Sequence, residues 1–518
     1  MTAQNIDTGA RCQAQTSNLK RPEKKMKSIT PQILRQVLVI TGLAFCNFSD
    51  GFIFGQMSGM VDALNGKDQS IPLSEDEVSW IASTINVTCF CGFALTAILT
   101  DVLGRRRTIT IVSIPMSICW IMVYFAQDKY TLLLTRVILG ISLGGFMIVT
   151  YTSVGEYVAP DMRSLCLNLM AVCASALGTL LGHVLSLLMH WRHVALVGLI
   201  PTIISAILPF FWVESPAWLA IKGRFTECEI AFRKLRTMNE ATESELKTLI
   251  DSQRENCNKL NKNRNVLTKV IGKYVKAWKG KPYRKIYALL VATSTYRVAA
   301  GRILISTLII TMLRDITGSS DILLSTLFVD GFSLIGSGLA CVFVSRFNMR
   351  SLLFTSGPLA NLIQIVLAFC MYFWTDNSIY EKWVKVTLLA LYCVVVSAGP
   401  YAVLETLLSE LHPLDISASS IFGIGAFGGI LQCLGIKLAA YLFPLIGYHG
   451  VFFVHSGVVF ACILYLYYFL PETKGRTNQE IQFYFKHNRF GTVDEILCLE
   501  QQNDLLSREM GDVSSLQS

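Results

Sequence analysis

The sequence predicts an all-α polytopic membrane protein with twelve transmembrane helices in two parallel six-helix repeats. Three observations predict this fold class. The chain is 52% hydrophobic and only 16% charged, whereas charged residues make up roughly a quarter of a soluble domain. Apolar stretches of about 20 residues, long enough to cross a hydrocarbon core, occur six times before Glu214 and six times after Tyr283. Short motifs of the first half recur in the same order in the second half.

Taken in chain order, the apolar stretches set the boundaries of the predicted helices and segments. The spans of the first half are 34–60, 78–100, 107–126, 131–158, 164–189 and 193–213, and those of the second half are 284–313, 321–344, 350–374, 382–409, 416–443 and 449–470. These spans divide the chain into five segments: a tail over 1–33, a bundle over 34–213, a linker with short helices over 214–283, a second bundle over 284–470 and a tail over 471–518.

Basic residues predict how these helices are oriented. Lys and Arg cluster in the amino-terminal tail, the turn at 105–107, the linker and the carboxyl-terminal tail, which all fall on one side of a twelve-span count. The first loop on the other side, 61–77, has five acidic residues and one lysine. Because positively charged loops stay in the cytoplasm, we expect both termini to be cytoplasmic. The first 30 residues have no apolar core, so we expect no cleaved signal peptide.

The linker is the most hydrophilic part of the chain. It holds fifteen basic residues against eight acidic ones. Within 267–278, apolar residues recur at helical spacing and lysines fill the other face. This pattern is typical of a helix lying on an anionic membrane surface, and equally of a solvated charged linker.

Three pairs of motifs reveal the internal repeat. The turn DVLGRRR over 101–107 corresponds to SRFNMR over 345–350, and EYVAPDMR over 156–163 corresponds to ELHP over 410–413. The sixth span ends in ESP at 214–216, and the twelfth ends in PETKGR at 471–476. A parallel duplication of this kind places a substrate site between the two halves, near the middle of the bilayer.

These motifs resemble those of the sugar porter family of the major facilitator superfamily, and the membrane region is similar to insect facilitated trehalose or hexose transporters. The segments VESPAWL at 213–219 and PETKGRT at 471–477 carry the resemblance most specifically. It implies the major facilitator fold and facilitated, alternating-access transport of a small sugar across the plasma membrane. Two alternatives remain open: transport of another polar or acidic solute on the same fold, and a sugar sensor that does not transport.

Charged residues at the cytoplasmic helix ends form two sets, one in each half. A single charge at a helix end is usually a solvated cap, but the resemblance implies that such sets meet across the halves and hold the inner ends shut when the cavity opens outward. The candidate gate residues are Asp101, Arg105, Arg106, Glu156, Arg163, Glu214, Arg346, Arg350, Glu410 and Glu472.

The predicted sugar site departs from the pattern that the resemblance implies. Sugar sites need hydrogen-bonding groups and aromatic faces, and family members carry a Gln pair and an Asn in span seven and a Trp in span ten. Here Arg297 and Val298 replace the Gln pair, Ile303 replaces the Asn, and Glu405 lies near the place of the Trp. The candidate solute-binding residues are Gln56, Tyr151, Asn168, Tyr296, Arg297, Arg302, Ser333, Glu405 and Gln432.

Ionisable residues inside spans are costly and face a cavity or one another. The spans contain Asp50, Arg297, Arg302, Asp330, Glu405 and Lys437. Mutual pairing and contact with solute both explain them. Proton-coupled members of the family carry an Asp where this chain has Ile53, which favours uniport. Asp50 lies about one helical turn earlier and is the alternative proton site.

No pattern in the sequence supports enzymatic chemistry. There is no nucleophile with a base, no phosphate-binding loop and no metal-ligand spacing, and His183 and His455 are interpreted as isolated buried polar residues. The fifteen cysteines lie in spans or cytoplasmic segments and predict no disulfide framework. We therefore expect no cofactor, no metal and no nucleic-acid partner. The expected partners are a small solute and membrane lipid, and the expected state is a monomer.

Overall fold

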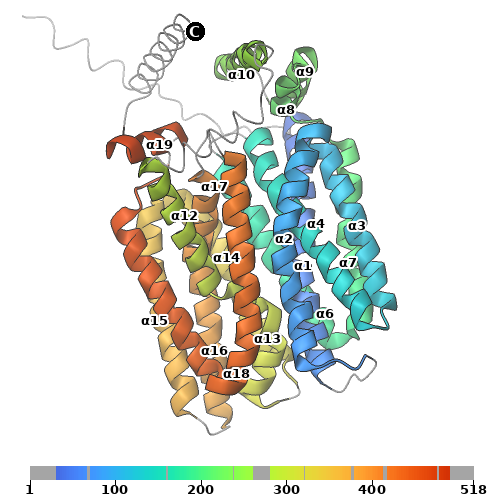
Figure 1. Ribbon diagram of the computed structural model, residues 1–518, viewed down its shortest axis with the longest axis vertical. Helices are drawn as coiled ribbons and strands as arrows, with labels where there is room; N and C mark the ends of the chain where they lie inside the picture. Colours follow the sequence, from blue (N-terminus) through green and yellow to red (C-terminus); the bar gives the residue numbers. More distant parts are fainter. Residues whose placement is uncertain are drawn as a thin grey trace, which may run out of the picture.

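The computed structural model describes residues 31–66, 71–158, 162–236, 239–260, 281–319, 321–374, 378–411, 417–474, 476 and 478–490. Within these residues the regular elements are all helical. Figure 1 shows two groups of long helices side by side, the first half in blue to teal and the second half in yellow to red.

The first half contains six spans. They are α1 (Pro31–Asn65), α2 (Glu75–Leu103), α3 (Arg105–Phe125), α4 (Lys129–Tyr157), a fifth span made of α5 (Arg163–Leu167), the π-helical η2 (Asn168–Ala174) and α6 (Ser175–Leu188), and α7 (Trp191–Ile207) with the 3-10 turn η3 (Leu208–Phe211). Local capping sets some of the ends: Ser74 and Glu77 form a capping box before α2, and Asp128 accepts from the Thr131 amide before α4.

Three linker helices follow: α8 (Pro216–Ile221), α9 (Phe225–Leu235) and α10 (Glu240–Leu260). The start of α1 is tied to the end of α9, because Gln36 donates to the Leu235 carbonyl at 2.8 Å. In Figure 1 these helices lie at the same end of the molecule as α19 (Asn478–His487). The amphipathic pattern over 267–278 lies outside the described residues.

The second half contains the other six spans. They are α12 (Lys281–Ala299) with α13 (Arg302–Thr317), α14 (Leu323–Arg346), α15 (Met349–Phe373), α16 (Ile379–Val396) with the π-helical η4 (Ser397–Tyr401) and α17 (Ala402–Glu410), and α18 (Ser417–Phe469).

Glycines divide two of these long segments. Gly301 has φ +69° and separates α12 from α13. Gly447 has φ +70° and bends α18 between two spans. The described residues contain eleven helices long and apolar enough to cross a membrane, one of which, Gly423–Phe469, holds both spans of α18. The twelve predicted spans are thereby confirmed.

Each half has its own apolar core. One cluster of buried residues belongs mainly to the first half, and the other mainly to the second half. Large apolar side chains such as Ile98, Ile121 and Leu362 are exposed on the outer surfaces of the bundles, as expected where helices face lipid. Two separately packed bundles can move against each other without rebuilding either core.

Candidate solute-binding cavity

A cavity of about 360 Å³ lies between the two halves. Side chains of α1, α2, α4 and α6 line it from the first half, and side chains of α12, α13, α14, α17 and α18 line it from the second half. Its volume lies at the lower end of the range for small-molecule sites. A solute in this cavity would contact both bundles at once.

Six of the nine predicted solute-binding residues line the cavity. They are Tyr151, Arg297, Arg302, Ser333, Glu405 and Gln432. Asp50 also lines it, as does Asp330. These residues come from both halves and meet between the bundles; their role in binding a solute stays a prediction.

The structure does not bring Gln56, Asn168 or Tyr296 to the cavity lining. Gln56 is fully buried inside the first bundle and accepts a hydrogen bond from Arg136 at 3.0 Å. Asn168 is buried on η2, and Tyr296 lies in the core of the second half. A polar residue inside a span bonds to a neighbouring helix as readily as it faces a cavity, and the sequence does not distinguish these two cases.

Arg297 and Glu405 form a buried ion pair, with 2.6 Å between Nε and Oε1. The Tyr151 hydroxyl donates to the other carboxylate oxygen at 2.7 Å. Since Tyr151 belongs to α4 and Glu405 to α17, this hydrogen bond joins the two halves. For Arg297, mutual pairing is therefore the arrangement that the structure adopts.

Arg302 is bound differently. Its guanidinium carbon lies 4.3 Å from the ring centroid of Tyr401, and Nη2 donates to the Ser337 hydroxyl at 3.4 Å. Nη1 is buried without a hydrogen-bond partner, and no carboxylate among the described residues lies within ion-pair distance of Arg302. An intramembrane cation left in this state indicates a functional site.

Asp50 is a second cavity residue with a buried polar atom that has no hydrogen-bond partner among the described residues. Its side chain lines the cavity, it is only 6% exposed, and its Oδ1 accepts no hydrogen bond from any described residue. A buried carboxylate is costly unless donors reach it. Hydroxyl groups of a solute would supply such donors.

His183 is not isolated, contrary to the interpretation of its sequence context. Its Nδ1 lies 2.7 Å from Oδ2 of Asp330, and its Nε2 lies 2.8 Å from the carbonyl oxygen of Ser306. Both ring nitrogens thus face oxygen atoms of the other half. The sequence did not indicate this contact between α6 and α14, because the two residues lie far apart in the chain.

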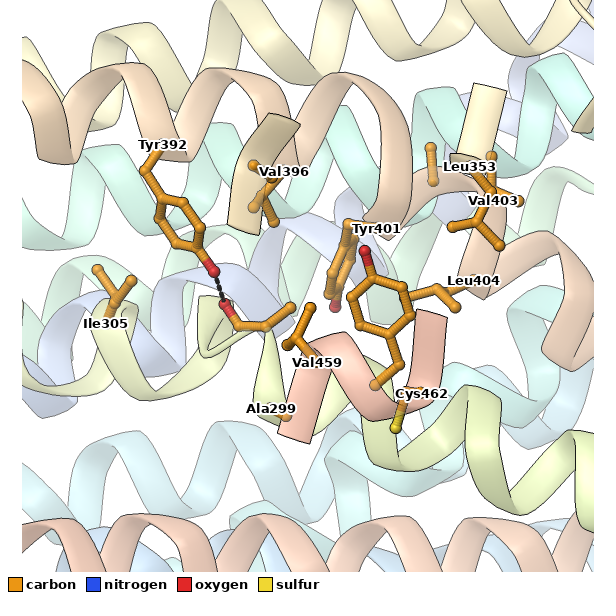
Figure 2. Packing of buried hydrophobic residues seen from close by; sticks show 14 of the residues in the cluster. Ala299, Ile305, Leu353, Tyr392, Val396, Tyr401, Val403, Leu404, Val459 and Cys462 are labelled. Atoms are coloured by element: carbon orange, nitrogen blue, oxygen red, sulfur yellow. Dashed lines mark hydrogen bonds between the residues drawn. The ribbon is translucent and has the colours of Figure 1, made fainter. Parts of the chain in front are cut away.

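The break in span seven positions the two cavity arginines. Arg297 precedes the break at Gly301 and Arg302 follows it. As Figure 2 shows, the Tyr392 hydroxyl points at the chain beside Ala299; it donates to the Ala300 carbonyl at 2.6 Å. His455 Nδ1 lies 3.0 Å from the Ala299 carbonyl. Side chains therefore satisfy carbonyls that the interrupted helix leaves free.

Tyr401 is a cavity residue that the sequence prediction missed. It closes the π-helical turn η4, lines the cavity and has its ring beneath Arg302. Figure 2 shows it between Val396 and Leu404, among residues of the second core. The available signal was an aromatic residue directly after Gly399-Pro400 in span ten. The resemblance places the aromatic residue of span ten about one turn later, where Glu405 stands.

In the first half, the predicted gate charges form one compact cluster at the linker end. Arg105 Nη2 lies 2.6 Å from Oε1 of Glu156, whose other oxygen accepts from the Ser215 hydroxyl. Glu214 Oε1 accepts from the amides of Arg105 at 3.0 Å and Arg106 at 3.4 Å. Glu214 therefore caps the positive N-terminus of α3.

The second half repeats this arrangement. Glu472 accepts from the amides of Met349 at 3.1 Å and Arg350 at 3.0 Å, which begin α15. Glu214 and Glu472 thus have equivalent roles at the third span of each half. The sequence repeat is a repeat of helix capping.

The remaining gate candidates do not join these clusters. Asp101 and Arg346 are exposed, and Arg163 donates to the Val158 carbonyl at 3.3 Å. The side chain of Glu410 lies outside the described part of the structure. No ion pair among the described residues joins the first cluster to the second. The lock between the halves therefore stays a prediction.

Contacts at the opposite end do cross between the halves. Asp62 of α1 pairs with Arg314 of α13 at 2.7 Å. Asp76, at the start of α2, binds both Lys437 and Tyr441 of α18. Lys437, expected inside a span, thus reaches an aqueous end of the helix bundle. These contacts join the halves on the side away from α8–α10.

Comparisons with known proteins agree with this architecture. A family model described as Sugar (and other) transporter matches residues 36–485. The facilitated trehalose transporter Tret1 of Polypedilum vanderplanki is 23% identical over 89% of this chain and 89% of its own length. Tret1 of Bombyx mori is 22% identical over 88% of each chain.

Solved structures show the same fold. The proton:xylose symporter XylE, bound to 6-bromo-6-deoxy-D-glucose, superposes with a TM-score of 0.71 at 18% identity, over 87% of this chain and 99% of that one. An inward-open conformation of XylE from E. coli gives a TM-score of 0.68 at 17% identity, over 86% and 99%.

Proposed function

Because this chain belongs to the Sugar (and other) transporter family, we propose that it carries a small sugar, trehalose or a hexose, down its concentration gradient by alternating access. It is a multi-pass membrane protein of the major facilitator fold and a transporter, not an enzyme. The observation that carries the proposal is the cavity between the halves, which is lined by Arg302 and Asp50, each with a buried polar atom that has no hydrogen-bond partner among the described residues.

Three side chains are proposed to hold the sugar. Asp50 accepts hydrogen bonds from the hydroxyl groups of the sugar, and Arg302 donates hydrogen bonds to the oxygen atoms of the sugar. Tyr401 supplies the aromatic face that span ten would otherwise lack. Arg302 already lies on that ring at 4.3 Å, so a sugar entering the cavity meets a combined cationic and aromatic surface.

The transport cycle follows from the contacts between the halves. Asp62 with Arg314, and Asp76 with Lys437, hold one end together. Toward the linker end, the hydrogen bond between Tyr151 and Glu405 joins α4 to α17. We propose that breaking one set while keeping the other exposes the cavity to one side at a time.

The end that carries the linker helices is proposed to face the cytoplasm of a plasma-membrane protein. The start of α1 and α19 both lie at that end (Figure 1), and the chain's basic clusters are on this side. The protein is proposed to work as a monomer, because each chain contains both halves of the site.

Uptake into proteoliposomes tests the function. We expect purified protein to equilibrate radiolabelled trehalose or a hexose across the membrane, without accumulation and with a flat pH dependence. Accumulation sensitive to an uncoupler would instead assign proton coupling, with Asp50 as the carboxylate. Selective uptake of an organic anion would replace the sugar as the solute, because Arg302 has no carboxylate partner in the protein. Absence of uptake for sugars, polyols and organic anions would contradict transport and favour a sensor.

A further inference from the structure

Two cysteines from opposite halves face each other beside the cavity. Cys173 lies on η2 in the first half, Cys341 lies on α14 in the second half, and their sulfur atoms are 3.7 Å apart. Cys173 Sγ also donates to the Ser337 carbonyl at 3.1 Å. The thiol pair lies where the fifth span packs against the eighth.

We propose that Cys173 and Cys341 form an oxidisable site, in which a peroxide links the two halves through a disulfide and stops the transport cycle. One of the two thiols, as its thiolate, attacks a peroxide oxygen, breaks the O–O bond and becomes a sulfenic acid, releasing water after proton transfer. The other thiol then displaces the sulfenic hydroxyl as a second water molecule. Two thiols and one hydrogen peroxide thus give one disulfide and two waters.

The geometry suits this chemistry. A disulfide requires a sulfur–sulfur distance of about 2.05 Å, so the two sulfur atoms, now 3.7 Å apart, need to approach by less than 2 Å. Cys173 is partly exposed and Cys341 is buried. A peroxide that enters from the side of Cys173 meets both sulfur atoms within a few ångströms, so either thiol can be oxidised and the other can resolve it.

The position of the pair gives the disulfide its effect. Both residues lie on the linker side of their spans: α14 ends at Arg346, shortly after Cys341, and the fifth span begins at Arg163, before Cys173. Opening toward that side requires the two bundles to separate there. A covalent bond between η2 and α14 prevents this separation, whereas each half keeps its own fold.

Peroxide treatment of purified full-length protein in proteoliposomes tests the site. We expect uptake to fall to the level of empty liposomes after hydrogen peroxide and to recover after dithiothreitol. Cys173→Ser and Cys341→Ser should each keep their uptake under peroxide. Cys166→Ser is the matched control, because Cys166 lies on the same span near Cys341 but makes no sulfur contact with it within hydrogen-bond distance; this variant should remain sensitive.

A second readout depends on neither the solute nor the variants. After oxidation, a protease cut engineered in the linker between α10 and α12 should leave the two halves as one band on a non-reducing gel and as two bands after reduction. Halves that separate without reduction would overturn the proposal, even if uptake fell. Peptide mass spectrometry must identify a Cys173–Cys341 linkage; a linkage through Cys166 would equally overturn it. Because the gel does not use transport, its result stands even if the proposed sugar is wrong.

Discussion

Replacing Glu405 with alanine removes one partner of the buried ion pair that links α12 to α17. The side chains of Arg297 and Glu405 are only 16% and 10% exposed, and their atoms approach to 2.6 Å. Removing one member of a buried pair costs about 3–5 kcal/mol, mainly because the other charge stays buried without a partner. The cavity allows some hydration of Arg297, so we expect about 3 kcal/mol. The lost hydrogen bond from Tyr151 adds about 1 kcal/mol.

Thermal unfolding of the purified protein in detergent measures this loss. For a folding unit of 150–250 residues, each kcal/mol lowers the midpoint by about 2–4 °C, so Glu405→Ala should unfold roughly 8–16 °C below the wild type. The double variant Arg297→Met with Glu405→Leu removes both charges and fills the space with apolar atoms. It should recover most of the stability, because replacing a whole buried pair is often neutral.

Two outcomes would refute this reasoning. One is a wild-type unfolding midpoint for Glu405→Ala, and the other is a double variant as unstable as the single one; either result would mean that Arg297 does not depend on Glu405. The matched control is Glu227→Ala. Its ion pair with Arg224 has side chains that are 50% and 52% exposed, and exposed pairs contribute little, so its midpoint should not change.

Three further variants test other parts of the structure. Gly104→Ala should lower the unfolding midpoint, because Gly104 has φ +88° and a Cβ there would lie 2.5 Å from a Glu214 carboxylate oxygen; an unchanged midpoint would contradict the capping role. Lys437→Ala should slow uptake by removing a contact to Asp76 that crosses the halves, and wild-type kinetics would count against it. Asp50→Asn should raise the KM for the sugar by roughly 5–30-fold, as expected for loss of about 1–2 kcal/mol of hydrogen bonding; an unchanged KM would remove Asp50 from the site.

Helix positions were predictable because each span must by itself be long and apolar enough to cross the hydrocarbon core of the bilayer. A span of roughly 20 apolar residues is required wherever the chain crosses lipid, and this requirement is local in the sequence. The predicted span 107–126 therefore agrees closely with α3 (Arg105–Phe125), and 350–374 agrees with α15 (Met349–Phe373). The motif pairs were also informative, since Glu214 and Glu472 do occupy equivalent positions.

It was harder to predict whether an individual polar residue faces the cavity or the interior of its own bundle. Gln56 and Asp50 lie on the same helix, yet Gln56 bonds inside the bundle and Asp50 faces the cavity. Likewise, Arg297 and Arg302 are close in sequence, but only Arg297 has a carboxylate partner. Helical rotation and the break at Gly301 separate their surroundings, and neither follows from hydropathy.

The amino-acid order alone was enough to establish a membrane protein of two repeated six-helix halves and its resemblance to sugar porters, because hydrophobic length, basic clusters and motif spacing are all local properties. Contacts between distant residues were accessible only once the helices were packed. The pairing of Glu405 with Arg297 and Tyr151, and the approach of His183 to Asp330, depend on how one bundle meets the other. That meeting is set by side-chain packing over the whole interface, which no single stretch of sequence encodes.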